Sequence, residues 1–205
     1  MLIRDRAYQN HCRIFGFQKL TLLDYPGKMA CTLFTGGCNF KCPFCHNSDL
    51  VFLPENMVEI EQEDVLEFLE KRKNILEGVC ITGGEPLLRK DIFKLIEKAV
   101  SRNLVVNVAS NGLIINEKMA KKIASSGVRS VTISLDASNE EFHDYFRQHP
   151  GLFRKTIKAI PLLKKEGVRV VVSFTLTLLN YKDCRNVVGF AHMLGSDAVN
   201  MSEYV

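Results

Sequence analysis

The sequence lacks the features that place a protein in or at a membrane. Its longest apolar stretch, Val168 to Leu179, is interrupted by polar residues and is shorter than the about 20 residues of a membrane-spanning helix. The N-terminal segment MLIRDRAYQN contains no apolar stretch of the kind found in secretory signal peptides. We therefore expect no membrane partner and a cytoplasmic location.

The sequence also lacks a strong excess of charge and any segment that would divide the chain. Its 27 Lys and Arg residues nearly balance 23 Asp and Glu residues, and the net charge of +4 is spread along the chain. This distribution does not favour a nucleic-acid partner. No repeat, low-complexity tract or linker rich in Pro or Ser interrupts the 205 residues. With 46% hydrophobic and 24% charged residues, the composition excludes disorder and favours one globular domain.

Cysteine is the residue type whose count is unusual. Seven cysteines, an odd number, in a chain without a signal peptide argue against a disulfide framework and for a reducing compartment. Three of them, Cys38, Cys42 and Cys45, are clustered, which indicates metal or redox chemistry. The other four are scattered and are expected to be buried or incidental thiols: Cys12, Cys31, Cys80 and Cys184.

Short runs rich in Val, Ile, Thr and Phe alternate with helical periodicities along most of the chain. The predicted strands are 30–35, 79–82, 105–109, 131–135, 170–176 and 198–205. The predicted helices lie around 65–76, 92–100, 119–124, 153–163 and 182–194. Nearly continuous apolar strands that alternate with helices predict parallel βαβ units, so the fold class is α/β. Six such strands predict a partial (β/α)6 barrel.

The first predicted strand runs into a cysteine-rich loop with the spacing C-x3-C-x2-C. In parallel α/β folds the chemistry lies at the carboxyl ends of the strands, which is where this loop begins. Three thiolates can hold three corners of a [4Fe–4S] cluster and leave the fourth iron open to a substrate. A structural zinc site with His46 as the fourth ligand is an alternative, although an adjacent Cys-His pair is awkward in a tetrahedral site.

The second predicted strand ends in the sequence Gly83-Gly84-Glu85-Pro86, here called the GGEP turn. Two glycines expose backbone to a ligand, and the carboxylate beside them can bind an ammonium group. The alternative is a tight turn into a helix with Pro at its first position. The preceding cysteine loop favours the ligand-binding interpretation.

These motifs together resemble the radical S-adenosylmethionine (SAM) superfamily. The resemblance rests on the cysteine triad, the GGEP turn, Ser110-Asn111-Gly112 after the third strand and Ser134-Leu135-Asp136 at the fourth. It extends from about Phe15 to the end of the chain. It implies an N-terminal extension, 1–14, followed by a radical SAM core domain, 15–205.

The resemblance implies roles for individual residues. Cys38, Cys42 and Cys45 would ligate the [4Fe–4S] cluster, and the open iron would chelate the amino and carboxylate groups of SAM. The SAM-binding residues that it implies are Phe44, Gly83, Gly84, Glu85, Ser110, Asn111, Ser134, Arg147 and Thr175, with Thr177 as a weaker candidate. No residue is assigned as a catalytic acid or base.

The resemblance also implies which part of SAM each of these residues contacts. Phe44 would pack near the adenine, the GGEP turn would bind the methionyl amino group, and Ser110 with Asn111 would line the methionine or ribose. Ser134 resembles a ribose-contacting serine and Arg147 an arginine that contacts the SAM carboxylate. The alternatives are that Ser134 caps a strand end and that Arg147 is a solvated helix residue.

Other polar residues near these motifs receive structural interpretations. Asp136 is expected to be an N-cap or loop carboxylate rather than a base. His46 is expected either to lie next to the cluster ligands without binding the cluster or to be structural. The remaining histidines considered are expected on the surface or in helices: His143, His149 and His192.

By the same resemblance, the protein is an enzyme that cleaves SAM reductively. An external one-electron donor of the flavodoxin or ferredoxin type would reduce the cluster. SAM would then be cleaved to methionine and a 5′-deoxyadenosyl radical, which abstracts hydrogen from a substrate. The protein positions the cofactors and keeps the radical away from competing partners.

The two halves of the chain resemble different branches of the superfamily. The N-terminal part, from Gly16-Phe17-Gln18-Lys19 to Cys45-His46-Asn47, resembles activating proteins of anaerobic ribonucleotide reductase and other glycyl-radical enzymes. The later part, Ser110-Asn111-Gly112 and Ser134-Leu135-Asp136 through Arg147, resembles molybdenum-cofactor and peptide-maturation enzymes. It departs from the activating proteins, which usually carry Asp-x-Lys where this chain has Ser134-Leu135-Asp136. We predict an activase with a glycyl-radical enzyme as its partner. The alternatives are a peptide- or cofactor-maturing enzyme with a peptide substrate, and a non-catalytic iron–sulfur or zinc module.

Overall fold

The structure is a computed structural model that describes residues 13–22, 25 and 27–203. The chain forms two compact units, and each has its own strands and helices. The first unit comprises Met1–Asn39, Asn47–Ala109 and Ser126–Arg129, and the second comprises Phe40–His46, Ser110–Ser125 and Ser130–Val205. None of the helices in this described part of the chain has the length and hydrophobicity that crossing a membrane requires.

The first unit is built on four strands whose hydrogen-bonded neighbours follow the chain order. These strands are β1 (Ile14–Thr21), β2 (Ala30–Thr35), β3 (Gly78–Gly83) and β4 (Val105–Ser110). β1 is antiparallel to β2, whereas β2, β3 and β4 are parallel. The helices of this unit are α2 (Ser48–Phe52), α3 (Gln62–Lys71), the 3-10 helix η1 (Pro86–Leu88) and α4 (Ile92–Val100).

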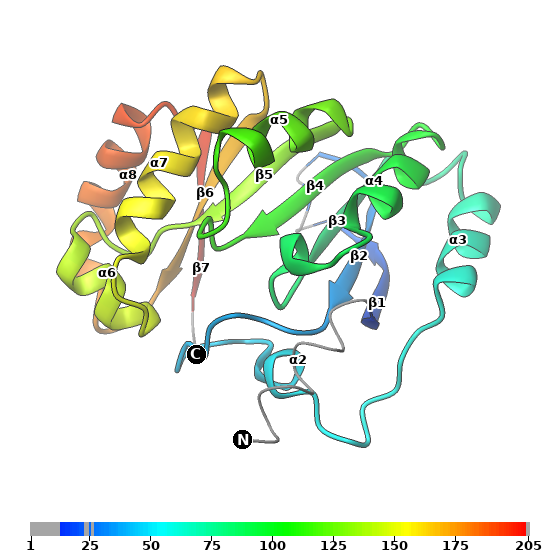
Figure 1. Ribbon diagram of the computed structural model, residues 1–205, viewed down its shortest axis with the longest axis horizontal. Helices are drawn as coiled ribbons and strands as arrows, with labels where there is room; N and C mark the ends of the chain where they lie inside the picture. Colours follow the sequence, from blue (N-terminus) through cyan, green and yellow to red (C-terminus); the bar gives the residue numbers. More distant parts are fainter. Residues whose placement is uncertain (1–12, 23–24, 26, 204–205) are drawn as a thin grey trace. The chain divides into compact units, whose positions relative to one another are not determined.

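The second unit contains three parallel strands with helices between them (Figure 1). The strands are β5 (Val128–Ser134), β6 (Arg169–Leu176) and β7 (Ala198–Glu203). The helices are α5 (Glu117–Ser125), α6 (Glu140–Arg147), α7 (Leu152–Lys165), the 3-10 helix η2 (Tyr181–Asp183) and α8 (Cys184–Met193). Both α7 and α8 contact β6, so apolar residues of the helices and the strand share one core.

Helix α6 is short, and its two ends are specified by the sequence. The side chain of Asn139 accepts a hydrogen bond from the Phe142 backbone N–H, which satisfies one donor of the first turn. The helix ends where Gln148 takes a left-handed conformation with φ of 53°. Arg147 is therefore the last residue of α6, and the chain turns immediately after it.

The α/β class with parallel strands and connecting helices is confirmed, and each of the six predicted strands is present. β2 matches its prediction to the residue, and β5 begins three residues earlier than predicted, at Val128. The structure adds β1, α2 and α6 to the predicted elements. β1 has mixed polarity, and α2 and α6 are only five and eight residues long, so each gives few periods for a prediction from the sequence.

Candidate functional site

In the first unit, the GGEP turn is bound to the beginning of the cysteine loop. Because β2 and β3 are parallel and in register at Thr35 and Gly83, both loops start at the same edge. The Gly84 N–H donates to the Thr35 carbonyl at 2.8 Å, and the Glu85 N–H donates to the Gly37 carbonyl at 2.8 Å. A Cβ on Gly84 would lie 1.9 Å from the Gly37 oxygen, so only glycine fits there.

Glu85 is a buried carboxylate within this turn. Its side chain is 2% exposed and accepts a hydrogen bond from the Leu87 N–H at 3.2 Å, at the start of η1. Pro86 is the first residue of η1, so the tight turn into a helix, considered above as the alternative, is present. This turn and a ligand role for Gly83, Gly84 and Glu85 are compatible, and the ligand role stays a prediction.

The three clustered cysteines are free thiols and are partly exposed, unlike Cys31 and Cys80, which are buried. Burial raises the pKa of the Cys31 thiol to about 12, so this thiol stays protonated in the core. Burial also raises the pKa of the Cys42 thiol, against the opposing effect of the Arg147 charge.

The donor set fits an iron–sulfur cluster by its chemistry. Three free, accessible thiols on one loop are the ligands that such clusters use. Cys38 belongs to the first unit, and Cys42 and Cys45 belong to the second. Among the described residues, no three His, Cys, Asp or Glu side chains are grouped closely enough to hold a metal ion. The ligand roles of the three cysteines therefore stay predictions.

In the second unit, the segment Phe40–His46 of the cysteine loop packs on the end of α6. The Phe44 and Phe146 rings stack with centroids 3.8 Å apart and planes 21° apart. The Phe40 and His149 rings lie 4.6 Å apart, and the Cys42 Sγ lies 3.8 Å from the Arg147 carbonyl oxygen. Two ring contacts and one thiol contact thus join this segment to the last turn of α6 and the residues after it.

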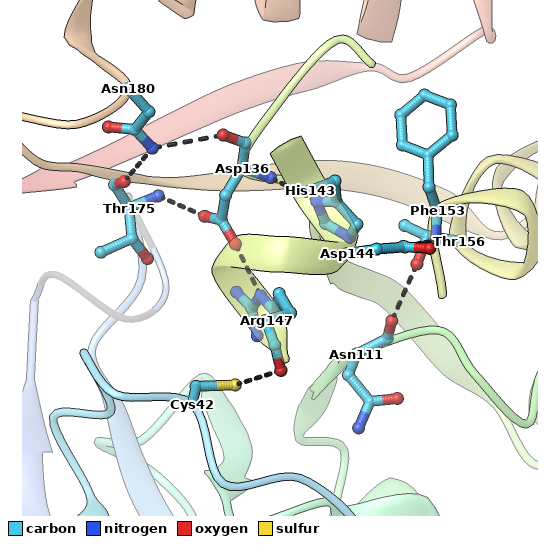
Figure 2. A network of polar contacts seen from close by, with 10 residues as sticks. All are labelled: Cys42, Asn111, Asp136, His143, Asp144, Arg147, Phe153, Thr156, Thr175 and Asn180. Carbon is cyan, nitrogen blue, oxygen red and sulfur yellow. Dashed lines mark hydrogen bonds and ion pairs between the residues drawn. The ribbon is translucent and has the colours of Figure 1, made fainter. Parts of the chain in front are cut away.

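Arg147 forms a buried ion pair with Asp136. Its Nε lies 2.6 Å from Asp136 Oδ2, and the two side chains are 12% and 0% exposed (Figure 2). Its guanidinium carbon lies 5.3 Å from the centre of the Phe44 ring. Arg147 is therefore not the solvated helix residue considered as an alternative. Asp136 is a loop carboxylate as expected, but the N-cap of α6 is Asn139.

The other predicted SAM-binding residues of the second unit lie at or after strand ends. Ser110 is the last residue of β4 and Asn111 follows it; both are buried, and their side chains accept hydrogen bonds from the N–H groups of Gly112 and Leu113. Ser134 ends β5 and is partly exposed, and Thr175 is buried in β6. The structure places these residues at the edge where chemistry is expected, and their contacts with SAM stay predictions. Thr177 lies after β6, where its N–H donates to the Asn180 side chain at 2.8 Å.

Two residues of this site, His143 and Asn180, are not predicted from the sequence. His143 lies in α6, which is one of the two places expected for it, and it is fully buried there. Its Nδ1 accepts the Asp136 N–H at 3.2 Å, and burial lowers its pKa to about 4. Asn180 donates to the carbonyls of Asp136 and Thr175 at 3.2 and 2.8 Å. The i,i+4 spacing of His143 and Arg147 is the signal that could have placed both on one face of a helix.

The remaining cysteines and histidines lie apart from these contacts or outside the described residues. His46 and His192 are exposed, and His149 is partly exposed. Cys184 is partly exposed, with its Sγ 3.4 Å from the Met201 Sδ. Cys12 and most of the predicted extension 1–14 lie outside the described residues.

The family model of the radical SAM superfamily matches residues 32–191, which is most of the chain. The chain belongs to the radical SAM superfamily. Members of this superfamily are enzymes that use a [4Fe–4S] cluster and SAM, so the predicted cofactors and enzyme class are confirmed at this level.

The relatives of this chain within the radical SAM superfamily are named for different reactions. The AdoMet-dependent heme synthase of Methanosarcina barkeri is 29% identical and matches over 82% of this chain and 48% of its own length. The PqqA peptide cyclase of Granulibacter bethesdensis is 25% identical, over 79% and 43%. The putative glycyl-radical enzyme activating enzyme MJ1227 of Methanocaldococcus jannaschii is 30% identical, over 77% and 65%. The chain spans about half the length of the first two relatives.

A solved structure of a radical SAM protein has the same fold. The structure of anSMEcpe with bound AdoMet aligns with a TM-score of 0.65 at 25% identity. The alignment covers 83% of this chain and 48% of that protein. The α/β core of this chain is therefore the radical SAM fold.

Proposed function

We propose that this radical SAM protein abstracts hydrogen from a peptide or from a cofactor precursor during its maturation. The observation that carries the proposal is the buried Asp136–Arg147 pair at the end of β5, with Cys42 next to the Arg147 carbonyl. A Ser-Leu-Asp sequence whose aspartate is bound to an arginine replaces the Asp-x-Lys of activating proteins. The names of the heme synthase and the peptide cyclase support the same branch.

Each group of residues has a distinct task in this proposal. Cys38, Cys42 and Cys45 hold the [4Fe–4S] cluster, and the GGEP turn binds the amino group of SAM. Arg147 binds the SAM carboxylate, because a guanidinium matches a carboxylate in charge and geometry. When bound, the cluster and SAM supply the superfamily's radical chemistry, and the protein positions them.

The smaller predicted contacts complete this arrangement. Phe44 packs near the adenine, and Ser110, Asn111, Ser134 and Thr175 line the methionine and ribose. We also infer that the core begins near residue 15 and extends to 205. An external donor of the flavodoxin or ferredoxin type provides the electron.

Hydrogen transfer from candidate substrates tests the proposal. The anaerobically reconstituted protein is incubated with SAM, dithionite and deuterated peptides or tetrapyrrole precursors, and 5′-deoxyadenosine is analysed by mass spectrometry. We expect deuterium in 5′-deoxyadenosine and a matching mass change in one substrate. If 5′-deoxyadenosine forms but takes deuterium from neither class, the maturation proposal is wrong.

An activase is the second candidate function. The 30% identity to the putative activating enzyme of Methanocaldococcus jannaschii and the N-terminal segment through Cys45-His46-Asn47 favour it. The partner would be a glycyl-radical enzyme with an accessible glycine loop. Electron paramagnetic resonance of a glycyl-radical enzyme incubated with the reconstituted protein and SAM would show a glycyl radical if this candidate is correct.

A further inference from the structure

Asp136 is a fully buried acidic residue whose polar groups all have partners in the second unit. One carboxylate oxygen, Oδ2, pairs with Arg147 Nε at 2.6 Å, and the other accepts the Thr175 N–H at 2.8 Å. The Asp136 N–H donates to His143 Nδ1, and its carbonyl accepts from Asn180. Figure 2 shows these contacts from β6, α6 and the loop after β6 converging on one residue.

Arg147 lies between Asp136 and the cysteine loop. Its side chain contacts Asp136 through Nε, and its guanidinium carbon lies 5.3 Å from the Phe44 ring centre. Its backbone carbonyl lies 3.8 Å from Cys42 Sγ. Arg147 therefore contacts both Cys42, a predicted cluster ligand, and Phe44, the ring predicted to pack near the adenine.

The physical chemistry of the pair restricts Arg147 to one orientation. A carboxylate that is 0% exposed is costly to bury unless its charge is compensated, so the ion pair is retained. A charge-assisted hydrogen bond through Nε fixes the plane of the guanidinium, because the group is rigid and planar. Since the Thr175 N–H and the backbone contacts hold Asp136 itself, the carboxylate is a fixed reference point.

We propose that Asp136 is a positioning residue that holds the Arg147 guanidinium in the orientation that binds the SAM carboxylate. This inference rests on the proposed function, in which Arg147 makes that contact. Asp136 itself touches neither SAM nor the substrate in this role. It acts through Arg147, so its effect on SAM binding exists only while Arg147 is present.

A double-mutant cycle on SAM affinity tests the inference. The dissociation constant of SAM is measured by anaerobic calorimetry on the reconstituted full chain. The variants are Asp136→Asn, Arg147→Lys and the double variant. We expect each single change to raise the dissociation constant about tenfold, the effect of losing a charged hydrogen bond. The double variant should bind no more weakly than either single variant, because both changes remove the same contact.

Asp144→Asn is the matched control. Asp144 is a nearby aspartate in α6, and it accepts hydrogen bonds from the N–H groups of Gly151 and Phe153 rather than pairing with Arg147. The control should lower the melting temperature and leave SAM affinity unchanged. Asp136→Glu, which keeps the carboxylate, should bind SAM more tightly than Asp136→Asn. If Asp136→Asn does not fold, Asp136→Ser, which also removes the carboxylate, takes its place in the cycle.

The outcomes separate this inference from the function on which it rests. If the Asp136 variant melts earlier but binds SAM as tightly as the wild type, the role is structural and the inference is wrong. Additive effects in the double variant would also overturn it, and the proposed function would stand. If the wild-type protein holds a cluster but binds no SAM, the proposed function and the inference both fail.

Discussion

At the residue scale, the environment of each glycine and histidine decides what a substitution does. Gly84 tolerates no Cβ because the Gly37 carbonyl lies in that space, whereas Gly189 in α8 has open space around it. His143 is buried and neutral, whereas His192 is exposed. These contrasts give two predictions, each with a control within the same chain.

The first prediction concerns the GGEP turn. Gly84→Ala should reduce the free energy of unfolding by about 3 kcal/mol, because the obstructing atom is backbone and cannot rotate away. Gly189→Ala should instead add up to about 1 kcal/mol, since alanine is the better helix former. Urea denaturation of both variants measures the difference. Equal effects of the two changes would show that the turn is not packed as described.

The second prediction concerns His143 and acid stability. Its pKa of about 4 in the folded protein lies below the ordinary value of 6.5. Between these two pH values the His143 imidazole therefore binds a proton when the protein unfolds. The stabilisation is complete above pH 6.5 and is lost as the pH falls towards 4, by about 3 kcal/mol. His143→Gln should lose this part of the pH dependence, as followed by urea denaturation from pH 7 to 4. His192→Gln should keep the wild-type profile, and a wild-type profile in His143→Gln would contradict the assignment.

At the element scale, the last turn of α6 supports part of the cysteine loop. Phe146 stacks on Phe44 in that loop, whereas Phe153 of α7 stacks on Phe190 of α8, with centroids 5.7 Å apart. The two phenylalanine pairs are chemically alike but stabilise different segments. Changes to them should therefore have separate local effects.

The third prediction follows from the two phenylalanine pairs. Phe146→Leu should increase amide hydrogen exchange in the segment Phe40–His46, because it removes the stacking contact. Phe153→Leu should increase exchange in α8 and leave that segment unchanged. Hydrogen-exchange mass spectrometry resolves the two regions. An unchanged segment in Phe146→Leu would mean that α6 does not support the loop.

The contrast between β2 and α6 shows what the sequence could predict at this scale. β2 is a nearly continuous apolar run that is followed by the cysteine loop, so the sequence predicts where this strand begins and ends. α6 is eight residues long and polar on much of its surface, so its periodicity is too brief to detect. The Asp136–Arg147 contact joins residues eleven positions apart and exists only because α6 folds back onto the loop that follows β5. Such a contact depends on tertiary packing, which local patterns do not encode.

At the scale of the whole molecule, Cys31 and Cys80 are buried, as the sequence analysis predicts. Cys184 is partly exposed and lies outside the cysteine loop, so it serves as the control for the three clustered thiols. The central claim is that the clustered thiols hold the cluster that cleaves SAM. Removing one of them should therefore abolish activity that removing Cys184 does not.

The most direct test is SAM cleavage by the reconstituted protein and two cysteine variants. With dithionite and SAM under anaerobic conditions, the wild-type protein should be brown, contain about four irons per chain and form 5′-deoxyadenosine. Cys184→Ala should behave as the wild type, and Cys42→Ala should lose iron and form no 5′-deoxyadenosine. Formation of 5′-deoxyadenosine by Cys42→Ala at the wild-type rate would contradict the account.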